Sequence, residues 1–179
     1  KQAIHLRPDF AEAYKSIGDV LQVLNRPVEA EARFKKAIAI KPDFTDAFIN
    51  LGLTLKGSDR LDEAQASFSQ AIVLKPDSVL AHNNLGITLH ELGRLEEAEA
   101  SLRQAIILKA DFSEAQNNLG NTLKGLGRLD EASASFALAI ALKPDFAAAH
   151  RHLASMKTPS TKDKQYAQMQ ELYFDLEIS

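Results

Sequence analysis

Residues 60–76 read RLDEAQASFSQAIVLKP, and residues 128–144, two steps of 34 further along the chain, read RLDEASASFALAIALKP. The same step of 34 relates AHNNLG at residues 81–86 to AQNNLG at residues 115–120. Alignment at this period produces columns of one residue type, two of which are Ala30, Ala64, Ala98 and Ala132, and Ala37, Ala71, Ala105 and Ala139. A period of this length is typical of stacked repeats, each too small to bury its own apolar surface.

Each repeat is expected to hold two antiparallel helices. The first begins at an aspartate such as Asp43, and the acid three positions later, Asp46, resembles a capping box. The second begins at the RLDEA stretch, where acids in the first turn suit the helix dipole. Left-handed backbone is expected where the first helices end, near Asn25, Asp59, Gly93 and Gly127. Glycine inside a helix costs roughly 1 kcal/mol relative to alanine, so a close helix contact is expected at each glycine of one column. These glycines are Gly18, Gly52, Gly86 and Gly120.

These columns resemble the tetratricopeptide repeat, whose A-x3-F…P signature matches Ala30, Phe34 and Pro42 and their copies. The resemblance covers residues 1–156 and implies an all-α, right-handed superhelical solenoid of helix-turn-helix repeats. The expected segments are the end of a preceding repeat (1–8), a solenoid (9–156), and a linker with a C-terminal amphipathic capping helix (157–179). The solenoid divides into four whole repeats, 9–42, 43–76, 77–110 and 111–144, and a half repeat, 145–156. Because Lys1 begins in mid-pattern, the chain is expected to be a segment of something longer.

Composition argues against several functional classes. The net charge of −3, from 21 basic and 24 acidic residues, gives no electrostatic reason to bind nucleic acid. The absence of cysteine excludes disulfides, thiolate zinc sites and cysteine nucleophiles. No apolar run approaches the roughly 18 residues of a membrane span, so no membrane partner is expected. The sequence assigns no compartment, although a cytoplasmic one is favoured.

We find no catalytic constellation and expect no enzyme activity, cofactor or metal site. His150 and His152 lie two positions apart, so on a helix they point in nearly opposite directions and cannot share a metal ion. The serines have no histidine and carboxylate companions close enough for a triad. No glycine-rich phosphate loop is present, because the repeat accounts for every glycine pattern.

One stripe of the first helix is not occupied by packing columns. In the second repeat it contains Asp46, Asn50, Leu53 and Gly57, whose spacing of four, three and four places them on one helix face. In tetratricopeptide repeat proteins this surface forms the concave groove that holds a peptide. Asparagine is a mediocre helix former, and its amide can satisfy a peptide backbone as both donor and acceptor. The candidate binding asparagines are Asn50, Asn84 and Asn118, with Asn83, Asn117 and Asn121 widening the amide surface.

Other side chains are expected along the same groove. An apolar pocket for a ligand side chain is expected from Ile49, Leu53, Leu80 and Ile87. Lys56, His90 and Lys124 would pair with acidic groups of the ligand. Lys15 and Asn50 fit the carboxylate clamp of the family, but Asp19, Leu80 and Asn84 stand where its other residues belong, so the clamp is judged absent. Alternatives without a ligand stay open for each group. The asparagines would have been copied along with the repeats or would bridge adjacent helices. The leucines and isoleucines would belong to the core between repeats, and the lysines would simply be solvated.

The leading functional prediction is a protein-protein interaction module that binds a peptide or partner protein in the concave groove. The asparagine before Leu-Gly resembles the asparagine array of the O-GlcNAc transferase superhelix, and HRHLASMK at residues 150–157 weakly resembles bacterial TPR-sulfotransferase proteins. A second reading is therefore a substrate-recruiting arm of a larger transferase whose catalytic domain lies outside this chain. A third is a scaffold that self-associates through its solenoid ends or its C-terminal helix.

Overall fold

The computed structural model describes residues 8–157, which form nine α-helices and no strand. The expected all-α solenoid is confirmed. The expected segments 1–8 and 157–179 lie almost wholly outside the described residues, and the division into repeats stays a prediction. The helices are α1 (Pro8–Val23), α2 (Pro27–Ile40), α3 (Thr45–Gly57), α4 (Leu61–Leu74), α5 (Val79–Glu91), α6 (Leu95–Leu108), α7 (Ser113–Gly125), α8 (Leu129–Leu142) and α9 (Ala147–Lys157).

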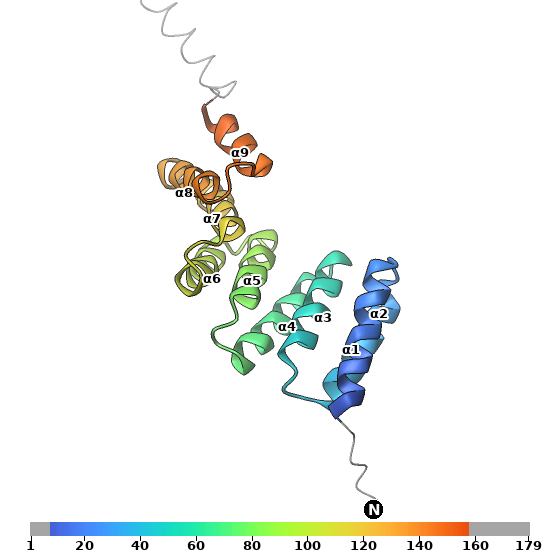
Figure 1. Ribbon diagram of the computed structural model, residues 1–179. Coiled ribbons are helices and arrows are strands. Elements are labelled where there is room, and N and C mark those ends of the chain that lie inside the picture. Colours follow the sequence, from blue (N-terminus) through green and yellow to red (C-terminus); the bar gives the residue numbers. More distant parts are fainter. Residues whose placement is uncertain (1–7, 158–179) are drawn as a thin grey trace, which may run out of the picture.

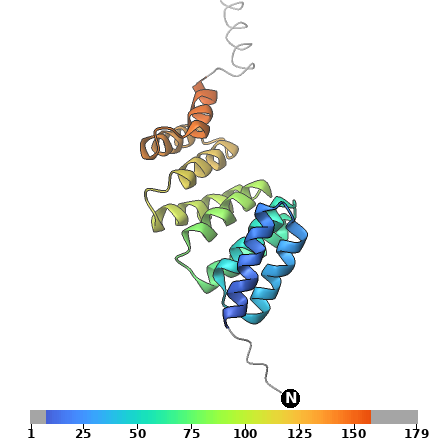
Figure 2. The ribbon, with the colours of Figure 1, turned by 45° about the vertical axis from the view of Figure 1, so that its right-hand side comes forward.

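The helices pack as antiparallel pairs that follow one another in chain order, from α1 and α2 at one end to α9 at the other (Figure 1). The helix axes change direction along the stack, from steeply inclined at α1 to nearly horizontal at α7 (Figure 2). The backbones of successive odd-numbered helices come close to each other, whereas those of successive even-numbered helices in the described chain do not and are bridged by side chains, as Arg103 of α6 is to Glu131 of α8. The odd helices therefore form the inner, concave layer of the curve.

The core of each pair is a large side chain pressed against a glycine. Phe34, Phe68, Leu102 and Phe136 are completely buried. A Cβ atom added at Gly120 would lie 2.6 Å from Cε1 of Phe136, and one added at Gly52 would lie 2.7 Å from Cε1 of Phe68. The expected close contact at the glycine column is therefore present, because the two helices approach where one of them has no side chain.

The first helices end as the sequence predicts, but α3, α5, α7 and α9 begin two residues after the expected aspartate, whereas α1 begins at Pro8, one residue before Asp9. Asn25, Asp59, Gly93 and Gly127 all have positive φ, and the next residue's amide bonds back five residues, as Arg26 does to Leu21. The predicted start at Asp43 is wrong: α3 begins at Thr45, and no side chain caps it. Asp43 lies instead in a turn, closed by a hydrogen bond from the Phe44 amide to the Lys41 carbonyl.

Arginines at the start of the second helices connect neighbouring repeats. Arg128 bonds Glu131 of its own helix and Glu99 of α6, at 2.6 Å each. Arg60 does the same with Glu63 and with Glu31 of α2, and hydrogen bonds from Lys35 and Arg60 lower the pKa of Glu31. The equivalent contact of Arg94 is to a neutral amide, Gln65, at 2.7 Å. The side-chain contact that joins α4 to α6 is therefore a hydrogen bond to a neutral group and not an ion pair.

Candidate functional site

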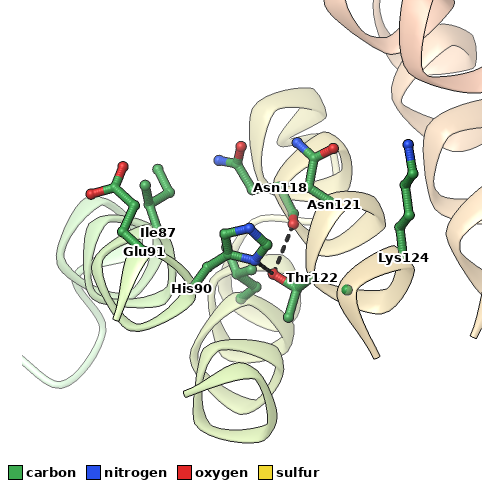
Figure 3. A pocket seen from close by; sticks show the side chains of 9 residues that line it. Ile87, His90, Glu91, Asn118, Asn121, Thr122 and Lys124 are labelled. Atoms are coloured by element: carbon green, nitrogen blue, oxygen red, sulfur yellow. Dashed lines mark hydrogen bonds between the residues drawn. The ribbon is translucent and has the colours of Figure 1, made fainter. Parts of the chain in front are cut away.

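The concave layer contains a cleft of about 540 Å³ between α5 and α7. Figure 3 shows Ile87, His90 and Glu91 along one wall, on α5, and Asn118, Asn121, Thr122 and Lys124 on α7. Leu102 and Gly125 complete the lining. Five of the candidate residues, Ile87, His90, Asn118, Asn121 and Lys124, are therefore brought together.

Two of the candidate asparagines bridge adjacent helices, which is one of the alternatives that the sequence left open. The amide of Asn118 donates to Oδ1 of Asn83 at 3.1 Å, and the amide of Asn50 donates to Oδ1 of Asp19 at 2.7 Å. Both asparagines are half-buried, and their own side-chain oxygens accept no hydrogen bond from the described residues. Each therefore joins two repeats and still keeps one free acceptor.

Asn84 behaves differently because its neighbour differs. The residue 35 positions before Asn118 is Asn83, but the residue 35 positions before Asn84 is Ile49, which has no acceptor. The amide of Asn84 instead donates to the Leu80 carbonyl of its own helix at 2.9 Å. The partner of a groove asparagine thus depends on which residues of the preceding repeat carry an acceptor, 35 positions earlier for Asn118 and 31 positions earlier for Asn50.

Asn83 and Asn117 do not widen the amide surface as predicted. Each is only 6% exposed, and each accepts a hydrogen bond across a repeat boundary, from Asn118 and from Nδ1 of His152 at 3.0 Å. They are interior acceptors, because their helix position faces the following odd helix. Asn121 is the opposite case: it lies in the cleft wall and makes no hydrogen bond with any described residue.

A hydrogen-bonded threonine lies beneath each groove asparagine. Thr54, Thr88 and Thr122 are buried, and the hydroxyl of each donates to the carbonyl four residues earlier, at Asn50, Asn84 and Asn118. Nε2 of Gln22 donates to Thr54 at 2.7 Å, and Nδ1 of His90 lies 3.3 Å from Thr122. Because Thr122 gives its proton to the Asn118 carbonyl, Nδ1 of His90 is the donor, and Nε2 points into the cleft (Figure 3).

Comparison with known proteins identifies the repeat. Two family profiles described as tetratricopeptide repeat match residues 49–115 and 113–146. Together they span residues 49–146, which is 98 of the 179 residues. The chain is a tetratricopeptide repeat protein. No curated protein sequence is significantly similar to it.

Solved structures share the fold. MamA from Desulfovibrio magneticus RS-1, residue 41 to the end, has a TM-score of 0.78 at 21% identity, over 94% of this chain and 96% of that one. YrrB, described as a TPR protein with an unusual peptide-binding site, has a TM-score of 0.68 at 24% identity, over 80% and 74%. The first TPR of Spaghetti (RPAP3), solved with the HSP90 peptide SRMEEVD, has a TM-score of 0.61 at 19% identity, over 63% and 89%. At such identities the likeness concerns architecture.

The apolar candidate residues of this tetratricopeptide repeat protein fall into two groups, those exposed along the groove and one buried in the core. Leu53 is 37% exposed, Leu80 is 56% exposed, and Ile87 is half-buried in the cleft wall. Leu53 also lines a smaller hollow of about 180 Å³ with Gln22, Asn25, Thr54 and Gly57. Ile49, at 6% exposure, belongs to the core. The groove surface over the second and third repeats is therefore partly apolar.

Most charged candidates are paired. Lys15 lies 2.8 Å from Asp19, whose hydrogen bond raises the pKa of Lys15, and Lys56 lies 3.2 Å from Glu91. Among the described residues, the ammonium group of Lys124 donates one hydrogen bond, to the Ser155 hydroxyl at 3.5 Å. Burial lowers the pKa of His152, and the nearby charges of Lys124 and Arg151 lower it further.

The sequence reading missed Thr54, Thr88, Thr122 and Gln22, although the threonines recur at the period of 34. A threonine column inside helices was the available signal, because threonine is a poor helix former and its repeated use there indicates a packing or hydrogen-bonding role. Within residues 8–157 no cluster of three or more metal-ligating side chains occurs. No described helix is both long enough and apolar enough to cross a membrane.

Proposed function

We propose that this protein is an interaction module that binds a peptide segment of a partner protein along the concave layer, centred on the α5–α7 cleft. The observation that carries the proposal is the free amide of Asn121 at the edge of a cleft of about 540 Å³ with an apolar wall. An exposed polar group in a concave, partly apolar pocket is the usual composition of a binding site.

The cleft offers the groups that an extended peptide needs. Asn118 and Asn121 lie three positions apart on one face of α7, and Figure 3 shows their amides side by side. The free Oδ1 of Asn118 would accept from a peptide N–H, and the Asn121 amide would donate to a peptide carbonyl. Ile87 would contact an apolar side chain of the ligand. The binding of peptides by YrrB and by the RPAP3 TPR supports this use of the fold.

We infer that the amides that bind the peptide are those of Asn118 and Asn121, because both line the cleft. Replacing Asn50, Asn84 and Asn118 together by alanine would be an ambiguous test, because Asn50 and Asn118 also join repeats. Asn121 makes no bond within the described chain, so its replacement tests binding alone.

The test is selection of a phage-displayed random 12-residue peptide library on the whole chain. We expect enriched peptides for the unmodified protein and none for Asn121→Trp, whose side chain would fill the cleft. Ala100→Trp, at an exposed position of α6, is the matched control and should enrich the same peptides. Equal enrichment by Asn121→Trp with an unchanged melting temperature would exclude the cleft as the binding site.

Self-association through the end of the solenoid is a second candidate. Ile17 is 47% exposed and Val20 58% exposed on α1, whereas Leu51 and Leu119, which stand at the position of Ile17 in later repeats, are buried. A second copy covering α1 would produce a dimer whose mass rises with concentration. Light scattering should detect it, and Ile17→Lys with Val20→Lys should abolish it, while a monomer at every concentration would exclude this candidate.

A further inference from the structure

The imidazole ring of His90 lies at the floor of the α5–α7 cleft. Its Nδ1 is 3.3 Å from the hydroxyl of Thr122, which is completely buried. Figure 3 shows the ring between this hydroxyl and the side-chain amide of Asn118, and Asn121 also lines the cleft. A peptide backbone held by the amides of Asn118 and Asn121 would therefore reach the His90 ring only through a side chain.

The hydrogen bonds beneath His90 fix which ring nitrogen carries the proton. The Thr122 hydroxyl donates its one hydrogen to the Asn118 carbonyl at 3.0 Å, so it accepts from Nδ1 of His90. In a neutral imidazole the nitrogen that does not donate is an acceptor. Nε2 of His90 is therefore an acceptor, and it forms no hydrogen bond with any residue in the range 8–157.

The other repeats place different chemistry at the position of His90. The residues related to it by the period of 34 are Gln22, Lys56 and Lys124. Nε2 of Gln22 donates to Thr54 at 2.7 Å, as His90 does to its own threonine, whereas Nζ of Lys56 donates to Glu91 at 3.2 Å. A glutamine or a neutral histidine that donates to the threonine keeps an acceptor, and a lysine has none.

The charges around the cleft favour an uncharged group opposite Nε2 of His90. A ligand carboxylate there would bring its lone pairs against that of Nε2, with no hydrogen between them. A cationic group would gain little from Glu91, which lines the cleft but already pairs with Lys56 at 3.2 Å, and Lys124 in the other wall would repel it. A hydroxyl or a carboxamide supplies a donor without a charge.

We propose that Nε2 of His90 selects an uncharged hydrogen-bond donor, a hydroxyl or a carboxamide, on one side chain of the bound peptide. This inference rests on the proposed function and adds the chemistry of one ligand side chain. It gives His90 the opposite role to the pairing with acidic groups that its place in the sequence suggested. Asn118 and Asn121 keep their contacts with the peptide backbone.

The peptide selection described above tests this role with variants that the other repeats supply. It is made at about pH 8, where an imidazole is neutral. We expect the peptides enriched by the unmodified chain to share one position occupied by serine, threonine, asparagine or glutamine. His90→Gln should keep this preference, because glutamine donates to Thr122 and still offers an oxygen. His90→Lys should lose it, because lysine, the residue at positions 56 and 124, has no acceptor.

The matched control adds the same charge outside the cleft. Ala100→Lys places a lysine at an exposed position of α6 and should keep the preference for a donor. Melting temperatures of all three variants separate binding from folding. If His90 served only to support Thr122, His90→Lys would lower the melting temperature and leave the peptide preference unchanged, which would overturn the proposal.

The outcomes separate the two proposals. Enriched peptides without a shared donor position, peptides that share an acidic position instead, or a donor preference that survives in His90→Lys would overturn the role of His90 alone. No enriched peptide from the unmodified chain would overturn the proposed function and this inference together.

A selected peptide made synthetically gives the size of the effect. Exchange of its donor residue for the nearest apolar one, such as valine for threonine, should weaken binding to the unmodified chain about fivefold, as the loss of one uncharged hydrogen bond would. The same exchange should have no effect on binding to His90→Lys. An equal loss for both chains would overturn the contact with Nε2.

Discussion

The side-chain amide of Asn118 donates a hydrogen bond to the side-chain oxygen of Asn83, 3.1 Å away, and so joins α7 to α5. Because Asn83 is buried, Asn118→Ala leaves an acceptor without a partner, which costs about 1–3 kcal/mol of unfolding free energy. Adding Asn83→Ile, the residue found at position 49, should recover much of that loss. Urea unfolding of the two single variants and the double variant measures the coupling. A double variant less stable than Asn118→Ala would contradict this interpretation.

Two glycines of α3 should respond to alanine with opposite signs. Gly52→Ala places a Cβ against the Phe68 ring, and overpacking of this kind costs about 1–3 kcal/mol. Alanine's higher helix propensity offsets that cost by roughly 1 kcal/mol. At Gly57 the added Cβ would meet no atom within 4 Å, so Gly57→Ala should stabilise the protein. Thermal unfolding gives the melting temperature of each variant. Melting temperatures that change in the same direction in both variants would refute the packing role of Gly52.

The neutral contact between Arg94 and Gln65 should be improvable. Gln65→Glu recreates the arrangement of Arg128 with Glu99, in which one arginine bonds an acid of the preceding repeat. We expect a higher melting temperature at low salt and no gain in 1 M salt, where charges at the surface are screened. The matched control is Gln70→Glu, at an exposed position of the same helix. A gain that persists at high salt would mean that charge is not its cause.

His152 should make stability depend on pH. Its pKa is lowered in the folded protein by burial, Lys124 and Arg151, so the unfolded chain binds the proton more readily. The contribution of neutral His152 is complete above the ordinary pKa of 6.5 and is lost as the pH falls through that value towards the folded-state pKa. His152→Asn removes the titrating group and retains a donor for Asn117, as Asn118 does for Asn83. The difference in unfolding free energy between pH 7.5 and 5.5 should be smaller in this variant, and equal differences would exclude His152 as the cause.

The fold was predictable because periodic residues determine it locally. The residues with positive φ, Asn25, Asp59, Gly93 and Gly127, are of the types that tolerate left-handed backbone, so helix ends could be placed from residue type alone. Helix starts were less predictable. An aspartate followed by an acid three positions later is compatible with a capping box at a helix start and also with a turn, so the pattern does not fix where the helix begins. In this chain Asp43 lies in a turn.

The concave stripe was predictable from the sequence, but the hydrogen bonds within it were not, and its role in binding stays a prediction. The stripe that contains Asn118 and Asn121 does line a cleft, yet a repeat alignment compares each residue with those 34 positions away. The actual partners are 31, 32 or 35 positions apart, as in the bonds from Asn50 to Asp19, from Gln22 to Thr54 and from Asn118 to Asn83. A column therefore reveals which residues are equivalent and does not reveal which of them touch. The resemblances to transferases stay predictions.

Ile49 has a consequence for engineering. Side chains of the preceding repeat determine whether a groove asparagine bonds across the boundary, as Asn50 does to Asp19 and Asn118 does to Asn83, or back to its own helix, as Asn84 does. The hydrogen-bonding groups that each repeat offers to a ligand therefore depend partly on the repeat before it. Shuffling or grafting single repeats would therefore alter the hydrogen-bonding capacity of the surface even when every residue exposed on it is transplanted unchanged. The smallest transferable unit in this chain is a pair of repeats together with the boundary between them.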